Sequence, residues 1–243
     1  MGELAGKRVL ITGGAGGVGR AVVKRMAEQG ARLLVTDRGQ RQLDQLAAEL
    51  ASGQLHTVEA DLARSDGVTR LFGQLDEKLG GIDLLVACAG VGSGPLMEMD
   101  ELGWRHVIES NLTSYVACTQ LAIERMRQAA TGEAMIILVG SISVHIKAVG
   151  ESVYNAAKGG VASFAETLRK EMMTEGIRVT LIEPGAIGSA MQPFSAEERE
   201  RMMQENKLLR PDSVAEAIMF AATRPPGVDV VTLRIEPMIQ KIY

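Results

Sequence analysis

Short apolar runs alternate along the chain with longer stretches in which apolar residues recur every three or four positions. The first pattern is typical of buried strands, and the second is typical of helices with one buried face. We expect strands at residues 7–12, 32–36, 55–59, 82–87, 134–139, 178–182 and 229–235. We expect helices at residues 18–29, 40–51, 65–79, 101–109, 112–129, 152–174 and 212–222.

Strands separated by helices of this length form right-handed βαβ units, which give a parallel sheet covered on both faces. The sequence contains no repeat, low-complexity run or internal linker, and its 243 residues can bury a large core. We therefore predict one α/β domain over residues 1–243, a doubly wound Rossmann fold with a seven-stranded parallel sheet.

A glycine-rich turn, Gly13-Gly14-Ala15-Gly16-Gly17-Val18-Gly19, stands between the first strand and the first helix. Without side chains, backbone N–H groups and the start of the helix can approach a pyrophosphate closely. The G-x-x-x-G-x-G spacing differs from the G-x-G-x-x-G fingerprint of many dinucleotide sites. A tight turn would explain one or two glycines, but five favour phosphate binding, with these contacts: Gly13, Gly17, Val18 and Gly19.

Tyr154 and Lys158 stand four residues apart on an expected helix, and Ser141 lies upstream near the end of an expected strand. Residues four apart share a helix face, so the ammonium can lie beside the phenol. Free tyrosine titrates near ~10, and a neighbouring cation favours its ionised form, so we expect Lys158 to lower the pKa of Tyr154. Such pairs also occur on solvated helices, so the accompanying motifs decide.

In combination, these motifs resemble the short-chain dehydrogenase/reductase family. The residues that carry the resemblance stand in the family's order and spacing over about residues 7–235: Thr12-Gly13-x-x-x-Gly17-x-Gly19, Asp61-Leu62, Ala89-Gly90, Asn111, Ser141, Tyr154, Lys158 and Pro184-Gly185. The resemblance implies hydride transfer between a nicotinamide cofactor and a secondary alcohol/ketone or aldehyde. Tyr154 would be the general acid/base, Ser141 would bind the substrate oxygen, and Lys158 would stabilise the phenolate and hold the nicotinamide ribose.

For Asn111, the resemblance implies a backbone carbonyl that holds a water on a proton relay, although a helix N-cap would suit the same residue. Asp61 resembles a residue that contacts adenine, with helix capping before residues 65–79 as the alternative. The remaining implied cofactor contacts are Leu62, Ala89, Gly90, Pro184, Gly185, Ile187 and Ser189.

Two positions set the expected choice of cofactor. Asp37 ends the second strand about twenty residues past the glycine turn, where a carboxylate accepts the ribose hydroxyls and repels a 2′-phosphate. Arg38 follows, and an arginine there pairs with the 2′-phosphate in NADP-using relatives, although it could also be a solvated loop charge. We predict NAD, with NADP as the alternative.

The chain departs from the family pattern at Ala87-Cys88, where many relatives carry Asn-Asn, and at Ser189, where threonine is usual. Cys88 is expected to be a small buried hydrophobic residue. We also predict a lid at about residues 190–209, which contains an amphipathic helix at residues 196–206. The candidate substrate residues, which lie after Ser141 and in this lid, are Ser143, His145, Glu151, Met191 and Phe194. A loop histidine without substrate contact remains open for His145.

The C-terminal sequence Ile235-Glu236-Pro237-Met238-Ile239-Gln240 resembles a branch that includes 3-hydroxy acid and clavulanate-aldehyde reductases, which tend to use NADP. The family resemblance also implies a homotetramer or homodimer. Helix 152–174 carries residues that could pair helices across such an interface or could face the sheet: Val153, Ala157, Val161, Phe164 and Leu168.

Composition narrows the remaining classes. A net charge of −4 and a pI of about 5.5 favour neither nucleic acid nor an anionic membrane, and we see no apolar run that would span a bilayer. Two cysteines give no disulfide framework, which suits a reducing cytoplasm, and no metal site is expected. The alternatives are an NADP-dependent ketoreductase or 3-hydroxy acid dehydrogenase and, outside enzymes, a cofactor-binding redox sensor or scaffold.

Overall fold

The apolar strands divide their side chains between two hydrophobic clusters. In β1 (Arg8–Thr12), Leu10 packs in one cluster, and Val9 and Ile11 pack in the other. Successive strand residues point to opposite faces of a sheet, so an all-apolar strand requires cover on both sides. The strands are therefore the centre of a three-layered molecule.

The computed structural model describes residues 2–50, 53–129 and 133–240. In these residues, seven parallel strands form one sheet in the order β3-β2-β1-β4-β5-β6-β7. The other strands are β2 (Arg32–Asp37), β3 (Leu55–Glu59), β4 (Leu84–Ala87), β5 (Met135–Val139), β6 (Arg178–Pro184) and β7 (Thr232–Ile235). The predicted single-domain Rossmann fold is confirmed.

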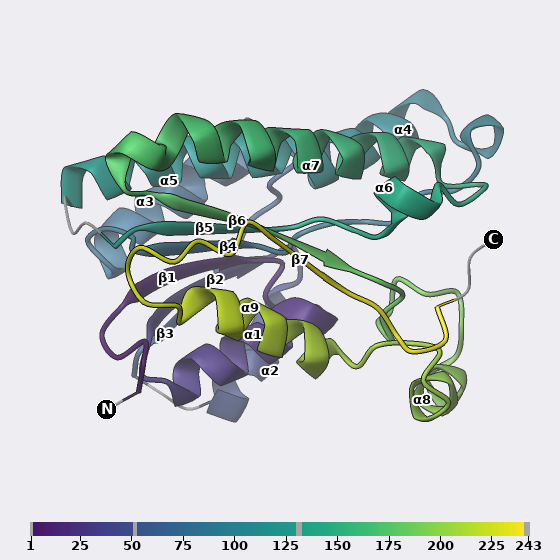
Figure 1. Cartoon of the computed structure of the whole chain (residues 1–243), viewed down its shortest axis with the longest axis horizontal. Helices are drawn as coiled ribbons and strands as arrows, with labels where there is room; N and C mark the ends of the chain where they lie inside the picture. Colours follow the sequence, from purple (N-terminus) through teal and green to yellow (C-terminus); the bar gives the residue numbers. More distant parts are fainter. Residues whose placement is uncertain (1, 51–52, 130–132, 241–243) are drawn as a thin grey trace.

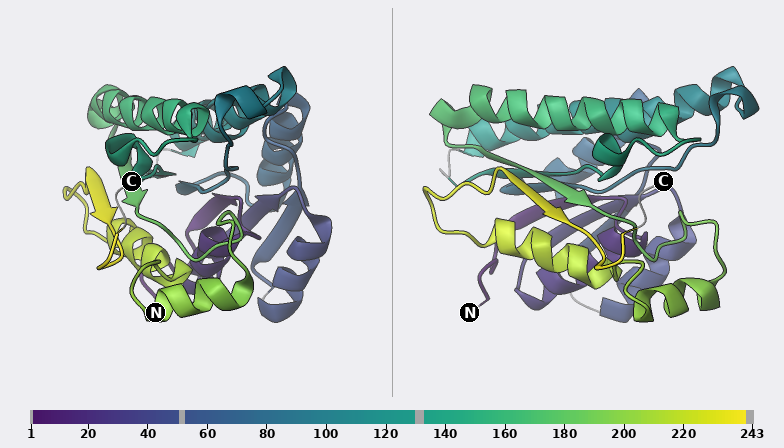
Figure 2. Two further views of the ribbon diagram at one scale, coloured as in Figure 1. Left: turned by 90° about the vertical axis from the view of Figure 1, so that its right-hand side faces the viewer. Right: turned by 45° about the vertical axis from the view of Figure 1, so that its right-hand side comes forward.

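Helices cover both faces of the sheet (Figures 1 and 2). On one face lie α3 (Ser65–Lys78), α4 (Glu101–Ile108), α5 (Ser114–Ala129) and α7 (Ser152–Met172). On the other lie α1 (Gly17–Glu28), α2 (Gln40–Leu50) and α9 (Pro211–Ala222). No helix in the described part of the chain has the length and apolar character needed to cross a membrane.

The helix around Asn111 differs from the sequence prediction. A break between two helices was expected there, but α4 continues through a π-helical turn, η2 (Glu109–Thr113), directly into α5. The N-cap interpretation of Asn111 is therefore wrong, because the residue lies inside a continuous helix. A π-turn has no strong sequence signal, since it is one extra residue within an otherwise ordinary helical pattern.

Short elements around the strand ends also went unpredicted. They are η1 (Leu96–Glu98) and α6 (Ser143–Ile146), both too short for a periodic pattern, while η3 (Met173–Glu175) is a 3₁₀ turn at the end of the helix predicted over 152–174. The expected lid helix is α8 (Ala196–Gln204), which stands apart from the sheet in Figure 1. The predicted positions 1, 51 and 241–243 lie outside the described residues.

The order in which the chain adds strands to the sheet reverses at one point, between β1 and β4. From β1 the chain proceeds to β2 and β3 on one side, and then returns to place β4 on the other side of β1. Loops leave the carboxyl ends of β1 and β4 in opposite directions here, which is where doubly wound proteins bind ligands.

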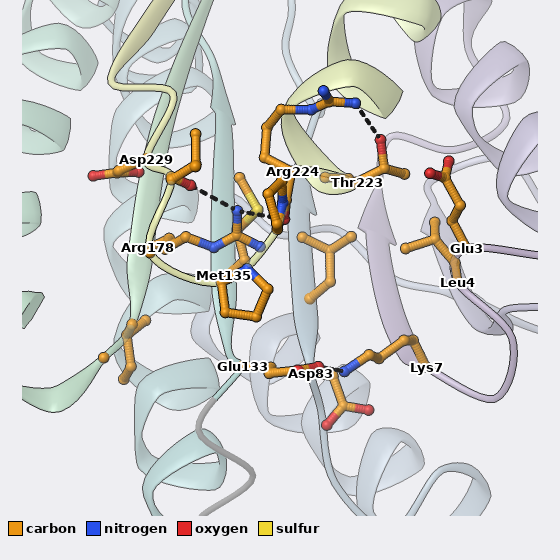
Figure 3. Close-up of a pocket in the computed structure, with 18 of the residues that line it drawn as sticks. Glu3, Leu4, Lys7, Asp83, Glu133, Met135, Arg178, Thr223, Arg224 and Asp229 are labelled. Atoms are coloured by element: carbon orange, nitrogen blue, oxygen red, sulfur yellow. Dashed lines mark hydrogen bonds and ion pairs between the residues drawn. The ribbon is translucent and has the colours of Figure 1, made fainter.

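A cavity of about 660 Å³ lies at the opposite, amino ends of the strands, with Lys7, Asp83, Met135 and Arg178 in its lining (Figure 3). Lys7 forms an ion pair with Glu133 there. This cavity is remote from the predicted catalytic residues, which all lie beyond the carboxyl ends.

Candidate active site

The glycine turn is packed against the loop that follows β4. Gly13 has a φ of 66°, and a Cβ on it would lie 2.7 Å from the Ala89 Cα. Both the left-handed backbone conformation and the lack of space therefore exclude a side chain at this position. The N-cap of α1 is Gly16, which offers no side-chain cap to the first turn. The first N–H groups of α1 remain available to an anion, and this backbone cradle fits the pyrophosphate of a dinucleotide.

Asp37 is tied to the glycine turn through its side chain. Its Oδ2 accepts the N–H of Ala15 at 3.0 Å, and its Oδ1 accepts the N–H of Arg38 at 2.8 Å. The carboxylate is thereby fixed beside the turn at the end of β2. The Arg38 side chain is exposed and lies against α4, with its Nη1 2.9 Å from the His106 Nε2.

Gly90, Asn111 and Lys158, which are far apart in the sequence, meet at one point. A Cβ on Gly90 would lie 2.6 Å from the Asn111 Oδ1 and 3.8 Å from the Lys158 Nζ. The Asn111 amide donates to the carbonyls of Val91 and Val107, both at 2.9 Å, and its Oδ1 accepts the Val91 N–H at 3.3 Å. Asn111 thus fastens the loop after β4 to the π-turn.

Lys158 is buried at the end of β5. Its ammonium donates to the Val139 carbonyl at 2.9 Å and to the Tyr115 hydroxyl at 3.2 Å. The Tyr115 hydroxyl in turn donates to the same carbonyl at 3.1 Å. Burial lowers the pKa of Lys158 to about 8, because the interior disfavours its charged form.

Tyr154 does not show the lowered pKa expected from its lysine neighbour. Burial raises its pKa above the ordinary value of 10.0, a hydrogen bond with Ser141 acts in the opposite direction, and the charge of Glu151 raises it further. The Lys158 Nζ lies 5.9 Å from the centre of the Tyr154 ring. The prediction is wrong for this arrangement, because loss of solvent around the phenolate outweighs its stabilisation.

Ser141 is oriented by the backbone and by Ser143. The Ser143 hydroxyl donates to the Ser141 Oγ at 2.8 Å, and the Ser143 N–H approaches the same atom at 3.2 Å. Since Ser141 accepts these bonds, its own hydrogen can point towards Tyr154 or a substrate oxygen. Ser143 is itself buried, and its two hydrogen bonds place it behind Ser141.

The segment after β6 lies against the glycine turn. A Cβ on Gly17 would lie 3.3 Å from the Ser189 Cβ, which brings two sets of predicted cofactor residues together. The Ile142 N–H donates to the Pro184 carbonyl at 2.9 Å, so this segment starts beside Ser141. The Ser189 Oγ accepts the Met191 N–H at 3.4 Å.

Other predicted cofactor residues have structural roles of their own. The Asp61 Oδ1 accepts the Ala63 N–H at 3.1 Å and forms a turn, whereas the N-cap position of α3 belongs to Arg64. The capping interpretation of Asp61 is therefore wrong in detail. Leu62 is buried in one hydrophobic cluster, and Val18 packs partly buried against the other cluster. Burial raises the pKa of the Cys88 thiol to about 12, which makes it an unreactive thiol.

His145, a candidate substrate residue, is engaged elsewhere. Its Nε2 lies 3.0 Å from the Glu183 Oε1 and 2.7 Å from the Arg234 Nη2. A single ring nitrogen cannot donate to the carboxylate and accept from the guanidinium at once. Whether this nitrogen carries a proton therefore determines which of the two groups it bonds. These contacts tie α6 to β6 and β7 and favour the loop interpretation of this histidine.

The other substrate candidates differ in placement. Glu151 is half-buried and close enough for its charge to affect Tyr154, and burial raises its own pKa. On the lid, Met191 is 51% exposed, and the Phe194 carbonyl accepts a bond from Arg199. Residues proposed for helix pairing are instead core residues that face the molecule's interior: Val153, Ala157, Val161 and Leu168, with Phe164 partly buried against them.

The family model described as short chain dehydrogenase matches residues 7–200. The chain belongs to this family. Short-chain dehydrogenases similar to it include the farnesol dehydrogenase of Aedes aegypti, which is 30% identical over 99% of this chain and 100% of the relative. The cis-4-hydroxycyclohexanecarboxylate dehydrogenase of Sinomonas cyclohexanicum is 34% identical over 92% of each chain.

Solved structures agree with this assignment. A dehydrogenase/reductase from Sinorhizobium meliloti 1021 superposes with a TM-score of 0.85 at 26% identity, covering 96% of this chain and 95% of the other. This short-chain dehydrogenase is an NAD(P)-dependent oxidoreductase that acts on CH–OH groups. The sensor or scaffold alternative is therefore set aside.

Sequence reasoning missed Tyr115, although a signal for it exists. Tyr115 stands four residues after Asn111 on a helix and so shares its face, where it meets Lys158. Glu183 and Arg234 pair across β6 and β7 in a register that no sequence pattern fixes. Among the described residues, no three His, Cys, Asp or Glu side chains gather closely enough to hold a metal ion.

Proposed function

We propose that this short-chain dehydrogenase transfers hydride between a nicotinamide cofactor, preferably NAD, and a secondary alcohol/ketone or an aldehyde. The observation that carries the proposal is the buried Lys158 ammonium, which lies 5.9 Å from the centre of the Tyr154 ring and donates to the Val139 carbonyl two residues before Ser141. A buried titratable pair of this kind beside a phosphate cradle is arranged for proton transfer. The cofactor supplies the hydride chemistry.

Each residue of this group has a proposed task. The Tyr154 phenolate accepts the alcohol proton in oxidation, and the neutral phenol returns it in reduction. Ser141, whose own acceptor capacity is used by Ser143, donates to the same substrate oxygen. Lys158 offsets negative charge on Tyr154 and holds the nicotinamide ribose. The backbone carbonyl of Asn111 holds the relay water.

The preference for NAD is supported by the position of Asp37. Its carboxylate is fixed beside the glycine turn, where it would accept ribose hydroxyls and repel a 2′-phosphate. The Arg38 guanidinium lies 2.9 Å from the His106 Nε2. An NADP-dependent ketoreductase or 3-hydroxy acid dehydrogenase is the second candidate, favoured by the exposed Arg38, which could turn from His106 to a phosphate.

Glu151 and the relatives bear on the substrate. The two relatives are named as dehydrogenases of farnesol and of cis-4-hydroxycyclohexanecarboxylate, the second of which carries a carboxylate. Because Glu151 places negative charge beside Tyr154, it would disfavour a substrate carboxylate near the reacting carbon. We propose a neutral hydroxylated or a cationic substrate, enclosed by the lid at residues 190–209.

We further propose that the protein is a cytoplasmic homotetramer or homodimer. The family likeness supports an oligomer, whereas the buried apolar residues of α7 give it no support. Exposed apolar side chains on α9 and in the loop before β7, such as Phe220 at 48% exposure and Val228 at 45%, are better candidates for contact.

Tyr154→Phe tests the chemistry. Loss of the phenol should lower kcat by about 10²- to 10⁴-fold, because no other group can exchange the substrate proton. Cofactor binding, measured by fluorescence titration of NADH and NADPH, should stay within about twofold, since the ring remains. Turnover within tenfold of the wild type would remove Tyr154 from the acid/base role.

Asp37→Asn tests the cofactor. The amide keeps one acceptor but loses the charge, so the ratio of the NADPH to the NADH dissociation constant should fall by about tenfold. Asp44→Asn, on the exposed face of α2, is the matched control and should leave the ratio unchanged. An unchanged ratio in Asp37→Asn, or tighter NADPH binding by the wild type, would favour the NADP-dependent candidate.

A further inference from the structure

The C-terminal sequence Ile235–Gln240 has no role in the proposed chemistry, but it contacts the segment that follows β6. The Gly185 N–H donates to the Ile235 carbonyl at 2.7 Å. The next N–H, that of Ala186, donates to the side-chain Oε1 of Gln240 at 3.0 Å. Two consecutive amides are thus held by the two ends of one short sequence motif.

The contact is close enough to require glycine. A Cβ on Gly185 would lie 2.5 Å from the Gln240 Oε1, 2.8 Å from the Pro237 Cδ and 3.1 Å from the Glu236 Cα. Gly185 is buried beneath this stretch. We name residues 236–240 the C-terminal clamp.

The segment from Ala186 to Ser189 is also held from its other side. The Leu209 N–H donates to the Ala186 carbonyl at 2.7 Å, and the Gly188 N–H donates to the Leu209 carbonyl at 2.9 Å. At its far end, the C-terminal clamp reaches the lid, where the Ile239 N–H donates to the Asn206 carbonyl at 2.9 Å. Figures 1 and 2 show the clamp beside both the loop after β6 and α8.

We propose that Gln240 is a positioning residue for the cofactor, which fixes the Ala186 N–H and thereby sets the place of the segment at Ile187 and Ser189. This inference rests on the proposed use of that segment for nicotinamide binding. Because Gly17 and Ser189 are nearly in contact, the place of this segment determines the space left between it and the glycine turn. A pyridine dinucleotide spans both and requires that space to be fixed before it binds.

Gln240→Ala removes the acceptor, and Gln240→Glu keeps one. Met238→Ala, at a 90% exposed position of the same clamp, is the matched control. Hydrogen exchange of the Ala186 amide measures the clamp directly, and fluorescence titration measures the dissociation constants of NADH and NADPH. We expect Gln240→Ala to speed that exchange and to raise the dissociation constant of the preferred cofactor about three- to tenfold.

Gln240→Glu should restore binding to within about twofold of the wild type, because the hydrogen bond and not the amide itself is required. Slow Ala186 exchange in Gln240→Ala, or fast exchange with unchanged cofactor binding, would overturn the positioning role. If the wild type binds neither NADH nor NADPH, the proposed function and the positioning role of Gln240 in cofactor binding are both wrong. The exchange experiment then still shows whether the C-terminal clamp holds Ala186.

Discussion

At the scale of single residues, the buried charge of Lys158 lowers the free energy of unfolding. The difference between its ordinary pKa of 10.5 and the value of about 8 corresponds to about 3 kcal/mol against the buried ammonium. Below pH 8 the folded protein bears this cost in full. As the pH rises from about 8 towards 10.5, the folded protein releases the proton before the unfolded chain does, so this residue's penalty disappears.

Glu151 and Tyr154 form a second electrostatic pair, which gives a prediction for the pH profile. The ionised Glu151 raises the pKa of Tyr154, so Glu151→Gln should lower it. Alcohol oxidation requires the phenolate, and the rising limb of kcat against pH should therefore move to lower pH.

The matched control for Glu151→Gln is Glu197→Gln, an exposed carboxylate on α8. It removes the same charge from the protein and should leave the pH profile in place. An unmoved rising limb in Glu151→Gln, with normal cofactor binding, would mean that Tyr154 does not limit oxidation in this pH range.

At the scale of elements, prediction succeeded where apolar residues recur over many positions. Every strand of the sheet and the long helices were predicted to within a few residues, since burial on one or two faces controls both patterns. The glycine turn and the group of Ser141, Tyr154 and Lys158 were found from motif and spacing. The π-turn at Asn111, the short α6 and the bond from Ala186 to Gln240 were not, because each depends on tertiary contacts.

Helix α8, in the proposed lid, is held by its own local hydrogen bonds. The Ser195 Oγ accepts the Glu198 N–H, the Glu198 side chain accepts the Ser195 N–H, and no residue of α8 is buried. Ser195→Ala should destabilise α8 by about 1 kcal/mol, which would appear as faster hydrogen exchange over residues 196–204. It should raise the KM of the substrate and leave the urea midpoint of the whole protein unchanged.

Ser195→Asn retains a capping side chain and is the control, with exchange close to that of the wild type. Equal exchange in Ser195→Ala and the wild type would show that packing, such as the contact of Met203 with Gly188, holds the lid instead. Faster exchange with an unchanged KM would separate α8 from substrate binding.

At the scale of the whole molecule, a stabilising ion pair and the proposed active site lie at opposite ends of the sheet. Beyond the carboxyl ends lie the proposed catalytic residues, whereas the amino ends of β1 and β4 are joined by Arg8 and Asp83. The Arg8 Nη2 and Nε donate to both Asp83 oxygens, at 2.7 and 3.0 Å. Burial opposes ionisation of Asp83, but the bonds from Arg8 outweigh it and hold its pKa below 3.8.

Asp83→Asn should therefore lower the free energy of unfolding by about 2 kcal/mol at pH 7, since it leaves Arg8 without its partner charge. The folded pKa of Asp83 lies below its unfolded value, so its contribution is present above pH 3.8 and is lost as the pH falls through the folded pKa. Urea unfolding at pH 7 and near pH 3 measures both. KM values should not change, and a difference that persists at pH 3 would argue against ion pairing.

The pairing of β5 with β6 continues past the strand ends, from Gly140 with Ile182 to Ile142 with Pro184. Ser141 is therefore carried on a rigid backbone ladder, while Met191 and Phe194 are carried on a segment outside the sheet. Variation in the lid can alter which alcohol is accepted without moving the serine. The division makes this scaffold suitable for directed evolution of specificity, with diversity confined to residues 190–209 and the ladder left intact.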